Sequence, residues 1–212
     1  MWSCHRRLWC EAPGENGPVT NTQHPSARYD DRAQRYADAF QDERLPMFPV
    51  DRNMIRMLVD LVGEHPRVLD AGCGAGQVTK MLRNWGCDAV GIDAAEKLID
   101  LTRTAYPGPA FTVSDLRALP YPDQDFDAIV ARYSVIHTAP GEVPTVVAEF
   151  ARVLRPGGCL LVEFQSSGSA PTRALAYAAA PAWAWKSDGS GRCWAAPGSW
   201  SARGSSVLHS PT

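Results

Sequence analysis

The spacing of hydrophobic residues predicts two amphipathic helices in the first third of the chain. One helix face is formed by residues that recur at three- and four-residue intervals, namely Ala33, Tyr36, Ala37 and Phe40. A second face of the same kind is formed by Met54, Leu58, Leu61 and Val62. Gly63 and Pro66 follow directly, and both residue types end helices.

From residue 67 onward, short apolar strands alternate with amphipathic helices. The pattern predicts strands over residues 67–70, 89–93, 110–113, 126–132 and 159–164. Helices are predicted after a glycine-rich loop at 72–76, over 95–105 and over 142–154. This alternation predicts an α/β fold of the Rossmann-like type, with an open, mostly parallel sheet and helices on both faces.

The two ends of the chain lack this periodicity. Residues 1–26 mix Pro, Gly, Asn and Thr, and we expect them to form a disordered N-terminal extension. Residues 166–212 are rich in Ala, Ser, Gly, Pro and Trp, and their abrupt change in composition resembles the product of a frameshift. We therefore expect a folded domain over 27–165 and a disordered or poorly packed, low-complexity tail over 166–212.

Composition excludes several classes of function. The formal net charge of the 212-residue chain is −2, so no global basic field favours a nucleic-acid partner. The longest apolar stretch, 174–185, is too short to span a membrane and contains Pro181. The six cysteines form no C-x-x-C pair, so we expect no metal site. These features favour a cytoplasmic protein that binds neither a membrane nor nucleic acid.

The strongest chemical signal is the glycine loop after the first strand. Gly72, Gly74 and Gly76 form a G-x-G-x-G pattern, and Asp70 precedes it. Glycines allow a tight turn close to a ligand, and the next helix offers its free N–H groups. The dinucleotide fingerprint is G-x-G-x-x-G, and Gln77 stands where its third glycine would be.

Two further acids follow the next two strands. Asp93 comes about 20 residues after the loop, as expected for an acid that binds ribose hydroxyls, and Ala94 lies beside it. The alternative role for Asp93 is a helix N-cap. Asp115 is placed to accept a hydrogen bond from the exocyclic amino group of adenine, with Leu116 packing on the base. The alternative is an ordinary turn aspartate.

Together these segments resemble the class I S-adenosylmethionine-dependent methyltransferases, in particular the small bacterial group related to the ubiquinone/menaquinone type. The resemblance covers about residues 27–165 and depends on segments 68–76, 91–93, 114–127 and 149–158. It implies S-adenosylmethionine as cofactor, with Asp70 near its methionine end, Asp93 on the ribose and Asp115 on the adenine. Family members usually add a final strand pair. We find none in 166–212, and strand 159–164 would then lie at an exposed edge.

The acceptor side of the site is expected after the fourth strand. Segment 131–138 lies where ligands bind beyond the carboxyl ends of parallel strands, and we count Arg132 among the cofactor contacts. His137 is a candidate general base if the acceptor must lose a proton, and a structural histidine bonded to backbone is the alternative. Tyr29 and Tyr36 are candidates to close over the cofactor, as in related enzymes, with ordinary packing as the alternative.

These residues predict methyl transfer to a small-molecule acceptor, for which positioning of the two reactants supplies much of the acceleration. Two alternatives remain open at the level of the sequence. The unusual tail favours a cofactor-binding remnant without turnover. An NAD-dependent oxidoreductase would need a glycine where Gln77 stands.

Overall fold

The computed structural model describes residues 25–40, 49–108, 110–175, 180–186, 201–202 and 207–209. The first described residues form three helices, α2 (Pro25–Asp30), α3 (Ala33–Phe40) and α4 (Pro49–Val62). The predicted N-terminal extension lies outside the described residues, except that its last two residues begin α2.

Five parallel strands form the centre of the molecule, as predicted. They are β1 (Arg67–Ala71), β2 (Asp88–Asp93), β3 (Phe111–Val113), β4 (Phe126–Arg132) and β5 (Leu154–Glu163). Their order in the sheet is β3-β2-β1-β4-β5, so the chain reverses its direction of winding between β1 and β4. The intervening helices are α5 (Gln77–Asn84), α6 (Glu96–Ala105), the single turn η1 (Val135–His137) and α7 (Val143–Val153).

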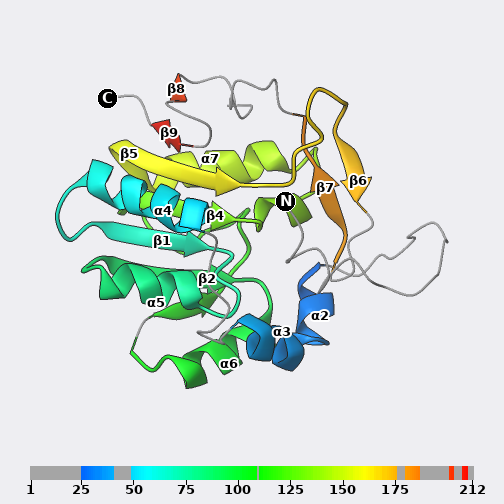
Figure 1. Ribbon diagram of the computed structural model, residues 1–212, viewed down its shortest axis with the longest axis horizontal. Coiled ribbons are helices and arrows are strands. Elements are labelled where there is room, and N and C mark those ends of the chain that lie inside the picture. The colour runs from blue at the N-terminus through cyan, green and yellow to red at the C-terminus, as the bar shows by residue number, and fades with distance from the viewer. Residues whose placement is uncertain are drawn as a thin grey trace.

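Helices cover both faces of this sheet (Figure 1). Ala128 and Val130 of β4 pack against α4 and α5 on one face. The alternating Ile129 and Ala131 pack against α7 on the other face. Since β4 is buried on both sides, it reads as a continuous apolar run in the sequence.

The predicted face of α4 is corrected at one position. Leu61 is 54% exposed, whereas Ile55, Leu58 and Val59 are buried against the sheet. Met54 and Val62 are partly buried beside them. The apolar stripe is wider than the sheet-facing surface, so the periodicity alone could not tell which edge of it faces solvent.

The expectation of a sheet without its final strand pair is wrong. Strand β9 (Val207–His209) pairs antiparallel with β5, and β8 (Ser201–Ala202) pairs with β9, which extends the sheet to seven strands. The unpaired N–H and C=O groups of β5 accept an extended segment readily. Strands of two or three residues are too short to show a hydrophobic period, which is why the sequence did not reveal them.

Part of the predicted tail is also well packed. Strands β6 (Arg173–Leu175) and β7 (Ala182–Ala184) form a separate antiparallel pair. Ala180, Ala182 and Ala184 are buried, so poor packing does not hold for this segment. In Figure 1, β1, β4 and β5 point toward the side of the molecule where α2 and β7 lie, so β7 stands beyond the carboxyl ends of the parallel strands.

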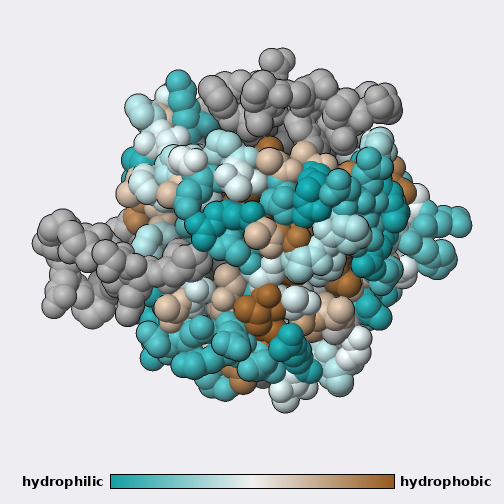
Figure 2. Space-filling model, turned by 180° about the vertical axis from the view of Figure 1, so that it is seen from behind, coloured by the Kyte–Doolittle hydropathy of each residue, from teal (hydrophilic) through white to brown (hydrophobic). Residues whose placement is uncertain are grey.

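The surface seen from behind is largely hydrophilic, with small hydrophobic groups between the polar side chains (Figure 2). Within the described ranges, every helix is too short or too polar to cross a bilayer.

Candidate functional site

The glycine loop has a backbone conformation that favours glycine at three positions. Gly72, Gly74 and Gly76 all have positive φ, at 83°, 53° and 82°. The N–H groups of Gly72 and Cys73 both donate to the carbonyl of Ile92 at 2.8 Å, which ties the loop to β2. A Cβ atom on Gly72 would lie 2.2 Å from the Cβ of Ser134, so this position also needs the absence of a side chain.

Asp93 joins the glycine loop to the start of α6. One carboxylate oxygen accepts the N–H of Gly74 at 3.0 Å, and the other accepts the N–H of Ala95 at 2.9 Å. Burial raises the pKa of Asp93, and these backbone donors oppose that rise. Each oxygen can accept a second hydrogen bond, so the half-buried carboxylate retains capacity for hydroxyl donors. Ala94 lies between Asp93 and Ala95.

Asp70 is almost fully buried, at 2% exposure. The Thr79 hydroxyl donates to it at 2.6 Å and so ties β1 to α5. Burial raises the pKa of Asp70 to about 6, and the bond from Thr79 and the charge of Arg132 oppose that rise. Sequence reasoning missed Thr79, whose only signal is its place in the first turn of the helix after the loop.

Asp115 lies beside Asp93, because Ser114 donates its N–H to the Asp93 carbonyl at 2.9 Å. Its carboxylate accepts the backbone N–H of Arg117 at 2.8 Å and the Arg117 guanidinium at 2.6 Å. The same guanidinium also binds Glu142. Leu116 is half-buried against the core. No pattern in the sequence indicates that Arg117 shares this carboxylate.

Arg132, which we expected at the cofactor, bridges two carboxylates. It donates to Glu163 of β5 and to Asp51 of α4, both at 2.7 Å. These side chains are 12–18% exposed. The second carboxylate oxygen of Glu163 is buried and has no hydrogen-bond partner among the described residues. The three residues fix the start of α4 at the carboxyl ends of β4 and β5.

His137 contacts two segments that are far away in the sequence. Its Nε2 lies 2.9 Å from the Tyr29 hydroxyl, and its Nδ1 lies 2.7 Å from the Pro181 carbonyl. The rings of Tyr29 and His137 meet edge to face at 5.3 Å, and Tyr29 meets Tyr36 in the same way at 5.5 Å. The Tyr36 ring contacts the glycine loop, 3.2 Å from where a Gly74 side chain would begin.

The acids therefore gather as predicted at the carboxyl ends of the first three strands. A ligand with hydroxyl groups, an amino-substituted base and a cationic amino-acid end fits this set. Asp93 and Asp115 are acceptors, and Asp70 is a buried carboxylate whose charged form a nearby cation would stabilise. The positive φ values let the loop backbone approach such a ligand closely.

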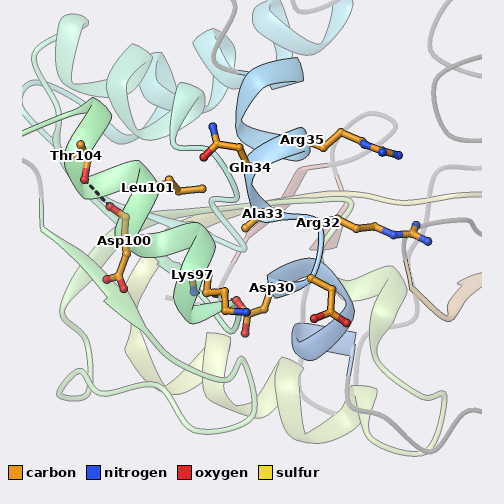
Figure 3. Close-up of a pocket in the computed structure, with 10 residues that line it drawn as sticks. Asp30, Arg32, Ala33, Gln34, Arg35, Lys97, Asp100, Leu101 and Thr104 are labelled. Atoms are coloured by element: carbon orange, nitrogen blue, oxygen red, sulfur yellow. Dashed lines mark hydrogen bonds between the residues drawn. The ribbon is translucent and has the colours of Figure 1, made fainter.

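A separate groove of about 690 Å³ lies between α2, α3 and α6 (Figure 3). Charged side chains of both signs line it, including Asp30, Arg32, Arg35, Lys97 and Asp100. In Figure 3, Lys97 lies beside Asp30, whereas Arg32 and Arg35 extend away from Asp100 and Thr104. The three acids of the glycine-loop site do not line this groove, and we assign it no part in that site.

Comparison with known proteins agrees with this geometry. Residues 69–162 match the family model described as "Methyltransferase domain". The chain is 33% identical over 150 residues to a demethylmenaquinone methyltransferase of Beutenbergia cavernae, which covers 69% of this chain and 60% of that protein. It is 30% identical over 122 residues to a malonyl-[acyl-carrier protein] O-methyltransferase of Serratia marcescens, covering 57% of this chain and 47% of that protein. The chain thus spans about half to three fifths of these relatives.

Solved structures show the same fold. A TehB-like S-adenosylmethionine-dependent methyltransferase of Corynebacterium glutamicum is 26% identical with a TM-score of 0.53, covering 67% of this chain and 73% of that one. A 1,6-didemethyltoxoflavin-N1-methyltransferase of Burkholderia thailandensis, solved with S-adenosylhomocysteine, is 18% identical with a TM-score of 0.64. It covers 93% of this chain and 94% of its own, so the likeness of fold extends beyond residue 165. Residues 69–162 therefore match a methyltransferase domain, and the chain is similar to class I S-adenosylmethionine-dependent methyltransferases.

Proposed function

We propose that this chain transfers a methyl group from S-adenosylmethionine to a small-molecule acceptor. The observation that carries the proposal is the double role of Asp93, which binds Ala95 at the start of α6 and Gly74 of the loop after β1, where the sheet reverses its winding. Ligands of open α/β sheets bind at this point, beyond the carboxyl ends of the strands. The matching family model and the similar methyltransferases support the same activity.

Different residues of the site bind different parts of the cofactor. The backbone of Gly72, Gly74 and Gly76 lies against it, and Asp93, with Ala94 beside it, accepts its ribose hydroxyls. Asp115 accepts the adenine amino group, and Leu116 packs on the base. Asp70 lies near the cationic methionine end, where its buried charge is favourable. When bound, the cofactor supplies a methyl group on a sulfonium.

The same acids argue against a dinucleotide. A pyrophosphate would meet Asp70 and Asp93 without a facing cation, because the Arg132 guanidinium already binds two carboxylates. We therefore keep Arg132 in the proposal as the group that offsets the charge of Asp70 and no longer as a direct cofactor contact. Tyr36 approaches the loop, and Tyr29 stands behind it against His137, our candidate for the acceptor side.

The proposed setting of the reaction is the cytoplasm, with a small molecule as acceptor. Cys73 and Cys87 are buried free thiols, which is typical of proteins from a reducing compartment. The formal net charge of −2 gives no general attraction to nucleic acid.

Isothermal titration of the full chain with S-adenosylmethionine, S-adenosylhomocysteine and NADH tests the proposal. We expect the two sulfur compounds to bind and NADH not to bind. Asp93→Ala should weaken binding at least about tenfold, because hydrogen bonds to a charged group contribute about 1.5–3 kcal/mol. The matched control is Asp100→Ala, an exposed acid on α6 that should leave the affinity unchanged. A folded wild-type chain that binds NADH and not S-adenosylmethionine would refute the proposal.

A further inference from the structure

Three segments that are distant in the sequence meet at His137. Tyr29 comes from α2, His137 from the turn after β4, and Pro181 from the segment that precedes β7. The hydrogen bonds join residues 108 and 44 positions apart. Nothing in the fold of the sheet requires this meeting, because the sheet is complete without α2 and without the β6–β7 pair.

The chemistry of the three groups sets the direction of both hydrogen bonds. The Pro181 carbonyl can only accept, so His137 Nδ1 carries a proton and donates it. Burial lowers the pKa of His137, with the Pro181 carbonyl opposing, and this favours the neutral ring. In the neutral ring with Nδ1 protonated, Nε2 is an acceptor, so the Tyr29 hydroxyl donates to it.

The pair lies next to the glycine loop. Tyr29 packs on Tyr36, whose ring contacts Gly74. Ser134, one residue before the turn that carries His137, contacts Gly72 and donates its hydroxyl to the Ala71 carbonyl at 2.7 Å. Both partners are therefore held by residues that touch the loop proposed to bind the cofactor.

We propose that Tyr29 and His137 form a proton relay for the acceptor, with the Tyr29 phenol facing the acceptor and His137 Nε2 taking the proton. This inference depends on the proposed function and names the acceptor class: a molecule whose methylated group is an acidic hydroxyl, phenolic or enolic.

The proton balance of the step is simple. The acceptor hydroxyl gives its proton to the Tyr29 oxygen while the Tyr29 proton passes to His137 Nε2. The products are an acceptor oxyanion, an unchanged phenol and an imidazolium whose Nδ1 proton is still bound by the Pro181 carbonyl. After methylation the imidazolium returns its Nε2 proton through Tyr29 to water.

The relay itself selects the acceptor. The proton ends on His137 and the Tyr29 phenol is regenerated, so the free-energy cost depends on how acidic the acceptor is relative to an imidazolium, and it is smallest for acidic hydroxyls such as phenols and enols. An alkyl alcohol is a far weaker acid, and moving its proton to the imidazole would cost much more free energy. A carboxylic acid is already ionised at neutral pH and needs no relay.

Pro181 is the positioning group in this arrangement. Its carbonyl fixes the protonated nitrogen of His137 and so turns the basic nitrogen toward Tyr29. The buried Ala180 and Ala182 hold this carbonyl in place. The C-terminal segment thereby contributes to the site through one backbone oxygen.

The test uses 4-nitrophenol, whose absorbance differs between phenol and phenolate. It is added to the full chain with S-adenosylhomocysteine, at a pH below the pKa of the free probe. We expect the phenolate band to rise severalfold with wild type and to stay at the level of free probe with Tyr29→Phe or His137→Gln. Tyr121→Phe, a half-buried tyrosine on the other side of the sheet core, is the matched control and should behave as wild type.

Two parallel measurements separate the possible failures. Titration of each variant with S-adenosylhomocysteine should give the wild-type affinity. Absence of binding by wild type would count against the proposed function, whereas a loss of affinity confined to Tyr29→Phe would make Tyr29 a cofactor contact and overturn the relay. Nitrogen-15 NMR of histidine-labelled protein, with His137→Gln for assignment, should show a protonated Nδ1 and a bare Nε2. The opposite tautomer, or an unchanged phenolate band with wild type, would also overturn it.

Discussion

The two halves of the site are built in different ways. On the cofactor side, the contacts that shape the glycine loop join residues close in the sequence, such as Thr79 with Asp70 and Gly74 with Asp93, 9 and 19 positions apart. On the acceptor side, Arg132 reaches Asp51 across 81 positions and Tyr29 reaches His137 across 108. The first half is therefore set by local sequence, whereas the second exists only once the whole chain has folded.

The two halves touch at Gly72 and Ser134, and the largest effect is expected there. Gly72→Ala would put a methyl group 2.2 Å from the Ser134 Cβ on a backbone with φ of +83°. Backbone strain of about 1–2 kcal/mol and overpacking of about 3 kcal/mol should lower the free energy of unfolding by about 4–5 kcal/mol in total. Binding of S-adenosylmethionine should be lost. Urea denaturation and titration calorimetry measure the two effects.

Two companion variants separate strain from collision. Gly63→Ala has the same kind of positive φ, at +96°, but no atom within 4 Å of the added methyl group, so it should show the strain alone. Ser134→Gly combined with Gly72→Ala removes the atom that collides. If the double variant is no more stable than Gly72→Ala, the two halves are not in contact through this pair.

The second-largest effect is expected at the buried arginine of the acceptor side. Arg132→Met leaves Glu163 and Asp51 without their shared cation, and breaking a buried ion pair costs about 3–4 kcal/mol. Arg56→Met, in a pair with Asp60 that is more than half exposed, is the control and should cost no more than about 0.5 kcal/mol. Equal losses of unfolding free energy in the two variants would mean that Arg132 does not organise the acceptor side.

The sequence predicted most of the sheet, because each parallel strand is a short apolar run beside a helix with a clear period. β4 was predicted at its observed bounds, 126–132. β5 begins at Leu154 and not at Cys159, because Leu154 pairs with Phe126 before the register shifts. Pro156 and Gly157 lie inside β5, where its register against β4 shifts, and residue types that favour turns cannot reveal that a strand continues through them.

The residues of the site likewise fall into those that the sequence predicts and those that it does not. Asp70, Asp93 and Asp115 are placed by strand ends, which a sequence reveals. Strand ends do not place the two carboxylates that bind Arg132. Their positions depend on how α4 and β5 pack, and no local sequence pattern indicates that packing. The role of Pro181 was equally out of reach, since a backbone carbonyl leaves no trace in residue type.

The third effect depends on pH and belongs to the cofactor side. The pKa of Asp70 is raised by burial from 3.8 to about 6, so the folded protein binds this proton more tightly than the unfolded chain. The stability that results is fully present below pH 3.8 and is lost as the pH rises through about 6. This loss amounts to about 2–3 kcal/mol, at 1.36 kcal/mol per pKa unit.

Asp70→Asn tests this effect, because an amide oxygen still accepts the Thr79 hydroxyl but does not ionise. The difference in unfolding free energy between the variant and wild type should grow in favour of the variant between pH 4 and 7. Asp60→Asn, which removes one carboxylate at an exposed position of α4, is the matched control variant. A flat difference for Asp70→Asn would show that Asp70 has an ordinary pKa.

The smallest effect is expected at a second arginine that also bridges two carboxylates. Arg117 binds Asp115 and Glu142 at the end of the cofactor side, as Arg132 binds Glu163 and Asp51 on the acceptor side. Arg117 is 34% exposed and Arg132 is 18% exposed. Water screens the more exposed pair, so Arg117→Met should cost less than about 1 kcal/mol of unfolding free energy in urea denaturation. If Arg117→Met costs as much unfolding free energy as Arg132→Met, then the number of bound carboxylates, and not the burial of the arginine, sets the cost. The two halves of the site would then not differ in this respect.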